Sequence, residues 1–212
     1  MSSHFANDLR QEQLLQPFLD RLYVKNGVGT ERCYDEERQR SGIDLYLFNP
    51  KRTYAVDEKA QLHNIGKSLS TFALELDFLK SGVLSPGWLF DPIKKTEVYS
   101  FVFDIRLHGG DTELVRWTQV RSAEIILVHR QRLIEELATV GLDRAALQRL
   151  SAKLRSSSER KLIVRAPGVV VIISRQLDEQ PVSLLVERSF LHSIGKTLTW
   201  TGETSSRKVL VV

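Results

Sequence analysis

The segment SGIDLYLFNPKRTYAVDEKAQ, residues 41–61, predicts a β-hairpin around which the rest of the chain can be placed. Ile43 to Phe48 and Thr53 to Ala60 are rich in branched and aromatic residues, as strands usually are. The residues between them, Asn49-Pro50-Lys51-Arg52, are of the types that form tight turns. We therefore expect two antiparallel strands joined at this turn.

The length of the turn predicts which residues face each other. If Asn49 to Arg52 form the loop, pairing runs backward from Phe48 opposite Thr53 and places Asp44 opposite Asp57. Like charges directly opposite each other on a sheet are destabilising, because their Cβ atoms are only about 5 Å apart. The register therefore predicts that a positive group lies between the two aspartates.

A divalent cation suits this position. Mg²⁺ prefers oxygen ligands and typically takes one or two carboxylates, leaving its other positions to water and substrate phosphate. Side chains alternate along a strand, so Lys59 and Gln61 share the face of Asp57 and Asp44. A protonated lysine cannot bind a metal, but it can orient a water or stabilise charge on a phosphorane-like transition state. This face predicts phosphodiester hydrolysis with Mg²⁺, or Mn²⁺ as a substitute, and with Gln61 as a helper.

The pattern Gly42-x-Asp44 followed by Asp57-x-Lys59 resembles the signature of the restriction-endonuclease-like nucleases, the PD-(D/E)XK superfamily. The resemblance implies that Asp44 and Asp57 hold Mg²⁺ and that Lys59 assists the water. It also implies a helix before the hairpin, a mixed sheet, and a second helix packed behind it. Ile43 stands where proline is usual and Asp57 where glutamate is commoner, and both are tolerated variants.

A second acid-x-Lys triplet, Glu159-Arg160-Lys161, shows that the triplet alone carries little information. It has no paired strand or suitably placed aspartate ahead of it. The first triplet has the hairpin register and Gly42, which would let a backbone or ligand approach closely opposite Lys59. The alternative interpretation is a solvent-exposed sheet face on which the acids and the lysine form ordinary surface ion pairs.

The segments on either side of the hairpin predict helices. Phe5 to Tyr23 has apolar residues at helical spacing, with Pro17 expected to kink or break the helix. Glu12 lies at the edge of the apolar arc and could be a further carboxylate near the metal, or simply a boundary residue. Ile65 to Leu79 also has helical spacing and predicts an amphipathic helix that covers the sheet. Asp35 to Arg40 is expected to be a solvated turn.

The sequence predicts an α/β fold with a mixed central sheet flanked by helices. A restriction-endonuclease-like core would occupy about residues 1–130, and residues 131–212 would extend the sheet or form a small lobe of the same domain. No long linker or internal repeat divides the chain. Further strands are expected at 30–34, 98–107, 123–128, 169–173, 182–186, 198–200 and 209–212, and further helices at 130–140, 143–155 and 189–194.

Length and composition indicate which kinds of protein this chain can be. The chain has 212 residues, enough for one substantial core, and the single cysteine Cys33 excludes an internal disulfide framework and fits a reducing compartment. No apolar run is long enough to cross a bilayer, and the first residues lack a signal-peptide pattern. We therefore expect a cytoplasmic protein with no membrane partner.

Positive charge is concentrated late in the chain. Residues 149–175 contain seven basic residues and one acid, Glu159, although the net charge of the chain is only +4. Such a stripe could follow a phosphate backbone, and could equally be a solvated helix face followed by a loop. Together with the carboxylates, it favours nucleic acid as the partner, with DNA preferred because of the resemblance.

The spacing of glycines and histidines excludes a phosphate-binding loop and a zinc site. Gly66-Lys67-Ser68 and Gly195-Lys196-Thr197 resemble the end of a phosphate-binding loop, but the required upstream glycine is missing from both. The five histidines form no pair or cluster of the kind that zinc prefers.

The sequence thus predicts a Mg²⁺-dependent endonuclease, and leaves open whether two copies form a homodimer to cut both strands. Two alternatives remain: a non-catalytic nucleic-acid-binding protein on the same fold, and an interaction module whose basic stripe meets an acidic protein.

Overall fold

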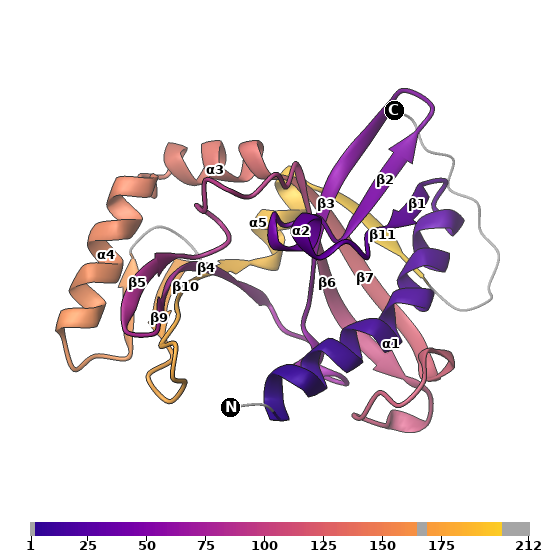
Figure 1. The fold of residues 1–212 in the computed structure, drawn as a ribbon, viewed down its shortest axis with the longest axis horizontal. Helices are drawn as coiled ribbons and strands as arrows, with labels where there is room; N and C mark the ends of the chain where they lie inside the picture. Colours follow the sequence, from indigo (N-terminus) through magenta and orange to yellow (C-terminus); the bar gives the residue numbers. More distant parts are fainter. Residues whose placement is uncertain (1–2, 165–168, 201–212) are drawn as a thin grey trace.

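The computed structural model describes residues 3–164 and 169–200 and shows a mixed α/β architecture built on two sheets (Figure 1). The first sheet has six strands, in the spatial order β1 (Gly29–Arg32), β2 (Leu45–Asn49), β3 (Arg52–Ala60), β6 (Val98–Leu107), β7 (Val120–His129) and β11 (Lys196–Thr199). The second has five, in the order β5 (Val83–Pro86), β4 (Thr71–Lys80), β10 (Val182–Glu187), β9 (Val169–Ile173) and β8 (Lys161–Val164).

Five α-helices surround these sheets in the described chain. They are α1 (Ser3–Lys25), α2 (Glu36–Arg40), α3 (Arg130–Thr139), α4 (Arg144–Ser156) and α5 (Arg188–Ile194). Short 3₁₀ turns occupy Leu62–Asn64, His108–Gly110 and Trp117–Gln119.

The first sheet is mixed because β3 and β6 run parallel, while its other neighbouring strands are antiparallel. A parallel pair needs a crossover connection, and here the crossover leaves the sheet to form β4 and β5 of the second one. The end of the chain returns to place β11 beside β7. Both sheets therefore contain strands from before and after residue 130.

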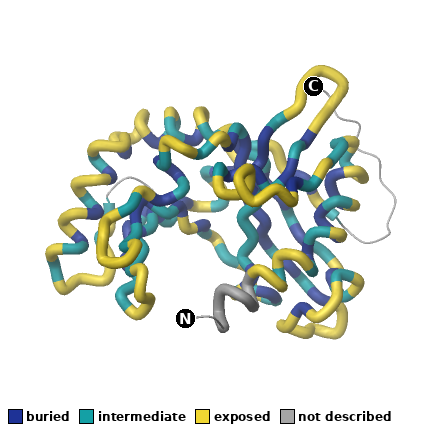
Figure 2. The backbone as a smooth tube through the Cα atoms, in the orientation of Figure 1, coloured by how far each residue is buried: buried dark blue, intermediate teal, exposed yellow. Residues whose placement is uncertain are grey.

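Two apolar clusters lie on opposite faces of the first sheet. One contains Leu15, Leu19 and Leu22 of α1 together with Leu45 and Val56 of the hairpin. The other fills the space between the two sheets, and includes Tyr99, Phe101 and Phe103 of β6 and Phe72, Leu74 and Leu76 of β4. Buried backbone accordingly follows the strands of both sheets in Figure 2. The first sheet is covered on both faces, which explains why β6 is buried at eight of its ten positions.

The helix predicted before the hairpin is confirmed as α1, and it continues through Pro17. Pro17 is exposed, so the carbonyl that loses its hydrogen bond can be solvated by water. The segment predicted as a solvated turn instead forms the short helix α2. Asp35 is its N-cap, since its carboxylate accepts the backbone N–H of Arg38 at 2.8 Å. This local hydrogen bond stabilises a helix in a segment that has no apolar residues.

The prediction of an amphipathic helix from Ile65 to Leu79 is wrong, because most of this segment forms strand β4. Phe72, Leu74 and Leu76 also alternate with a period of two, and all three are buried between the sheets. Pairing with β10, far along the chain, selects the strand over the helix. The second helix implied by the resemblance is therefore not at this position, and α5 instead contacts β7 and β10.

The second half of the chain follows the prediction more closely. The helices α3, α4 and α5 and the strands β7, β9, β10 and β11 are confirmed, and Asp143 caps α4 by accepting the Ala146 N–H at 2.7 Å. The short strands β5 and β8 were not predicted. The strand expected at 209–212 lies outside the described residues.

Candidate active site

The hairpin register predicted from the turn is confirmed for Leu45 to Phe48, but the ladder begins at Leu45 and does not include the predicted pair of Asp44 with Asp57. Leu45 lies opposite Val56 and Phe48 opposite Thr53. The ladder extends by one further pair, Asn49 with Arg52, so the loop proper is shorter than expected. The Asn49 carboxamide closes it by accepting the backbone N–H groups of Lys51 and Arg52 at 2.8 and 3.0 Å.

Asp44 immediately precedes β2 and lies against β3. Its backbone N–H donates to the carbonyl of Val56 at 2.9 Å, and its carboxylate accepts the backbone N–H of Glu58 at 2.8 Å. These two bonds hold the Asp44 carboxylate beside the Asp57-Glu58 peptide. Asp44 is half-buried, whereas Asp57 is only 2% exposed.

Lys59 supplies positive charge next to the acids. Its Nζ lies 2.7 Å from Oδ1 of Asp57, and its side chain is 30% exposed. The two residues are two positions apart on one strand and so share one face of it. The second oxygen of the Asp57 carboxylate, Oδ2, is buried and has no hydrogen-bond partner among the described residues. A buried, unpaired carboxylate oxygen is costly, and it indicates a position where a cation can bind.

Gly42 lies beside this unpaired oxygen. Its φ of +78° suits glycine, and an added Cβ would lie 2.5 Å from Thr96 Oγ1 and 3.6 Å from Asp57 Oδ2. The Gly42 carbonyl accepts the Thr96 hydroxyl at 2.7 Å. The glycine therefore allows close approach next to Asp57, where the sequence had predicted it opposite Lys59.

We expect Gly42→Ala to lower the free energy of unfolding by about 1–3 kcal/mol, because it adds backbone strain and a clash with Thr96. Gly82→Ala is the matched control, since Gly82 has a φ of +80° but nothing within 4 Å of an added Cβ. Urea unfolding measures the free energy of unfolding of both variants. The loss in Gly82→Ala reports the backbone strain alone, and the additional loss in Gly42→Ala reports the clash. Equal losses in the two would show that the space around Gly42 is not needed.

The two aspartates are electrostatically coupled. Burial and then the charge of Asp57 raise the pKa of Asp44, Lys59 and the Glu58 N–H lower it, and the net result is a pKa of about 7. Burial alone would lower the pKa of Lys59, but the charges of Asp57, Asp44 and Glu12 outweigh it and raise that pKa above its ordinary value. The lysine therefore stays protonated at neutral pH, next to a carboxyl group that titrates there.

We expect Asp44→Asn to stabilise the metal-free protein. The pKa of Asp44 rises from 3.8 to about 7 on folding, so the folded state keeps a proton that the unfolded state releases, and stability falls as the pH rises between these values. An asparagine removes that penalty and still accepts the Glu58 N–H. In a chelator-containing buffer, its gain over wild type should grow from pH 5 to about 1–3 kcal/mol at pH 8.

Thermal unfolding at the two pH values measures this gain, with Asp178→Asn as a control on an exposed turn. Added Mg²⁺ should then stabilise the wild type more than Asp44→Asn, because only the wild type has both carboxylates. A variant that is less stable than wild type at pH 8 would contradict the repulsion.

Glu12 and Gln61, the two residues predicted to assist at the site, have different environments. Glu12 is exposed on α1 and acts on Lys59 through its charge. Gln61 follows β3, and its Nε2 donates to the carbonyl of Thr71 at 2.8 Å. Gln61 therefore joins the end of β3 to the start of β4, and this hydrogen bond gives it a structural role.

Two further residues near Lys59 were missed by the sequence analysis. Burial raises the pKa of Glu75 on β4, and the charge of Lys59 is the strongest effect that lowers it, which places the two groups near each other. The ring of Trp88 lies 5.5 Å from Lys59 Nζ. The alternation of Phe72, Leu74 and Leu76 was the available signal, because a strand there turns Glu75 away from the apolar residues.

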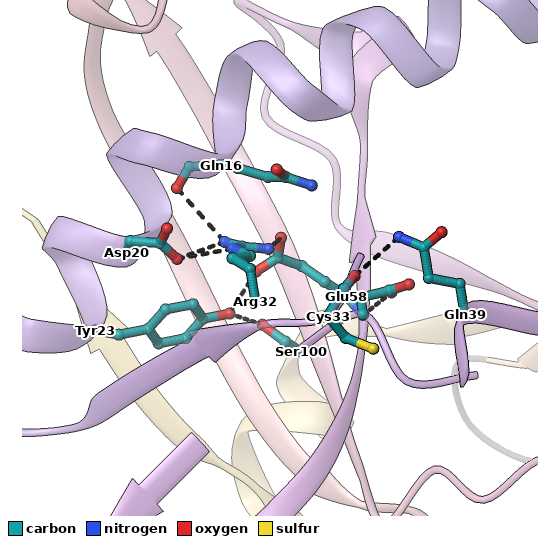
Figure 3. A network of polar contacts seen from close by, with 9 residues as sticks. Gln16, Asp20, Tyr23, Arg32, Cys33, Gln39, Glu58 and Ser100 are labelled. Carbon is teal, nitrogen blue, oxygen red and sulfur yellow. Dashed lines mark hydrogen bonds and ion pairs between the residues drawn. The ribbon is translucent and has the colours of Figure 1, made fainter. Parts of the chain in front are cut away.

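The opposite face of the hairpin carries a buried polar network that holds α1 in place (Figure 3). Arg32 of β1 lies 2.8 Å from the Glu58 carboxylate and 2.7 Å from that of Asp20. Tyr23 donates its hydroxyl hydrogen to Glu58 at 2.7 Å and lies 2.6 Å from the Ser100 hydroxyl. Burial raises the pKa of Tyr23, so its hydroxyl stays protonated. This network orients β3, and so the residues on its other face.

The described residues contain no group of three or more His, Cys, Asp or Glu side chains arranged to hold a metal ion. Asp44 and Asp57 could supply two carboxylate ligands, which is within the number that Mg²⁺ takes from proteins. The buried, unpaired Oδ2 of Asp57 fits such a role.

The basic stripe is only partly available to a ligand. Arg155 forms an ion pair with Asp77 at 2.5 Å, and Arg175 donates to the carbonyls of Leu154 and Ser157 at the end of α4. Arg165 lies outside the described residues. The exposed members of the stripe are Arg149, Lys153, Arg160 and Lys161.

Comparison with protein-family models, with curated proteins and with solved structures finds no match to this chain. Among residues 3–164 and 169–200, no helix is long and apolar enough to cross a membrane.

Proposed function

We propose that this protein is a metal-dependent nuclease that hydrolyses phosphodiester bonds, with DNA as the preferred substrate. The observation that carries the proposal is the arrangement around Asp57: one oxygen 2.7 Å from Lys59 Nζ, the other buried and unpaired, and Asp44 close enough for the two charges to interact. A solvent-exposed face with ordinary ion pairs would not leave a carboxylate oxygen buried and unpaired.

Asp44 and Asp57 would hold Mg²⁺, or Mn²⁺ in its place. When bound, the metal supplies a water of lowered pKa and neutralises charge on the phosphate. Lys59 remains an ammonium group and donates a hydrogen bond to the water or to a phosphate oxygen. In the reaction, the water gives a proton to solvent as its oxygen bonds to phosphorus, the ester P–O bond breaks, and the released alkoxide takes a proton from solvent.

A relation to the restriction-endonuclease-like nucleases is part of the proposal. It is supported by α1 ahead of the hairpin, by the mixed first sheet, and by the positions of Asp44 just before β2 and of Asp57 and Lys59 on β3. The second sheet, inserted between β3 and β6, distinguishes this chain from the arrangement that the resemblance implied.

Cleavage of a panel of labelled substrates tests the function. Linear and circular DNA, single-stranded DNA and RNA are each incubated with Mg²⁺, with Mn²⁺ or with a chelator, and products are resolved by electrophoresis. Metal-dependent cleavage of DNA is the expected result. Salt-sensitive binding without turnover in any metal would instead support the non-catalytic alternative.

We expect Glu75→Gln to lower kcat about tenfold with little change in KM, because Glu75 acts as a positioning residue through the charge of Lys59. Glu179→Gln is the matched control, since Glu179 is exposed on the turn before β10. Glu75→Asp should recover part of the loss. Steady-state cleavage rates check this, and equal kcat values for Glu75→Gln and Glu179→Gln would remove Glu75 from the site.

A further inference from the structure

A pocket of about 420 Å³ lies between α4 and the β4–β5 hairpin of the second sheet, and none of its lining residues belongs to the hairpin of β2 and β3. Figure 1 shows α4 and β5, which supply most of its lining residues, at the left-hand end of the molecule. Leu76, Leu84, Phe90 and Leu147 give it an apolar lining. Its volume is within the range of small-molecule sites, and is too small for a helix or a strand of a partner protein.

Two polar groups in the lining lack the partners that such groups normally have. The hydroxyl of Ser151 is buried and has no hydrogen-bond partner among the described residues, in a residue only 2% exposed. Arg144 is exposed and forms no ion pair with a described residue, and its guanidinium lies 5.8 Å from the ring of Phe90. The Ser151 hydroxyl is inaccessible from the pocket, so the unpaired cation of Arg144 beside the apolar lining is the feature that complements a ligand with acceptor oxygens.

The charges around the pocket favour an anion. Asp77, the acid in the lining, is neutralised by Arg155 at 2.5 Å. Asp143 lies next to Arg144 in the chain, but it is not a lining residue and its carboxylate accepts the backbone N–H of Ala146. The charge of Arg144 is therefore not balanced within the pocket.

We propose that this pocket binds a small amphipathic anion, with an apolar body between α4 and β5 and a carboxylate or phosphate group on Arg144. Pro86 and Phe90 line the pocket on either side of Trp88, whose ring lies near Lys59. The loop that carries them thus extends from the pocket to the Asp57 site, although binding in the pocket does not depend on nuclease activity.

Fluorescence titration with 8-anilinonaphthalene-1-sulfonate, an aromatic anion of suitable size, tests the proposal on the full chain. Arg144→Glu should weaken saturable binding about tenfold by reversing the charge. Ala152→Trp should weaken it at least as much, because Ala152 is an exposed lining residue of α4 and a large ring there fills the pocket. Arg149→Glu, on the same helix but outside the lining, should change the affinity less than about twofold.

Competition distinguishes the head group from the apolar body. Octanoate and octyl phosphate should displace the probe at lower concentrations than the neutral 1-octanol, and their order shows which head group the pocket prefers. Displacement by octanol at the same concentration as octanoate would overturn the role of Arg144. Probe binding that is absent, or unchanged in both Arg144→Glu and Ala152→Trp, would overturn the site.

Discussion

Asp57→Ala is expected to reduce metal-dependent cleavage by about 10³-fold or more, which corresponds to roughly 4 kcal/mol of transition-state stabilisation. Asp57 is the only member of the site that is almost fully buried, and it both pairs with Lys59 and presents the unpaired oxygen. Its removal takes away a metal ligand and the partner of the ammonium group. Lys59→Ala should produce a loss of similar size while leaving metal binding by the two aspartates in place.

The second acid-x-Lys triplet provides the matched control. Glu159 and Lys161 are both exposed, and Lys161 begins the edge strand β8. Lys161→Ala should therefore cleave at the wild-type rate. Circular dichroism should show the same fold in all the variants. If folded Asp57→Ala and wild type degrade every substrate of the panel equally in Mg²⁺ and Mn²⁺, the catalytic proposal fails.

Arg32→Met is expected to cause the largest loss of stability, about 3–5 kcal/mol in the free energy of unfolding. The side chains of Arg32 and Glu58 are only 6% and 9% exposed, so the change leaves a buried carboxylate without its cation. Among the residues that the structure describes, the Tyr23 hydroxyl is the donor that would remain to it. Because this network joins α1 and β1 to β3, the loss should appear as a lower midpoint for the whole cooperative transition.

A double variant separates the contribution of the ion pair to the free energy of unfolding from the contribution of side-chain packing. Arg32→Met combined with Glu58→Gln removes both charges and should recover at least half of the loss, since a glutamine can still accept from Tyr23. Arg40→Met is the surface control, because its ion pair with Glu36 is about four-fifths exposed and should contribute less than about 0.5 kcal/mol. Urea unfolding measures all four proteins. A loss for Arg32→Met no larger than that for Arg40→Met would contradict the structural role of the network.

The part of the candidate site that is formed by residues close together in the sequence could be predicted from the sequence. Asp57 and Lys59 lie on β3 and Asp44 immediately precedes β2, and the tight turn between these strands sets which residues of the ladder face each other. The faces follow from the alternation of side chains, which places Lys59 beside Asp57 and turns Glu58 toward α1. Glu75 could not be found in this way, because the segment that carries it also fits a helical pattern.

Strand β4 shows why that pattern was insufficient. Apolar residues from Ile65 to Leu79 match both helical and strand periods, so the local signal does not choose between them. The choice depends on β10, which pairs with β4 from the end of the chain, and on the aromatic residues of β6 that pack against Phe72. Such contacts contribute more free energy than intrinsic propensity does.

The amino-acid sequence therefore contained the hairpin, its register and the acid pair with its lysine, because each depends on neighbours a few residues away. Tertiary structure alone determined the second sheet, the approach of Glu75 and Trp88 to Lys59, and the ion pair of Arg32 with Glu58. It also left one oxygen of Asp57 buried and unpaired, a property that no local pattern encodes. The physical reason is that burial and charge pairing are set by segments distant in the chain, whose contacts exist only once the two sheets have packed.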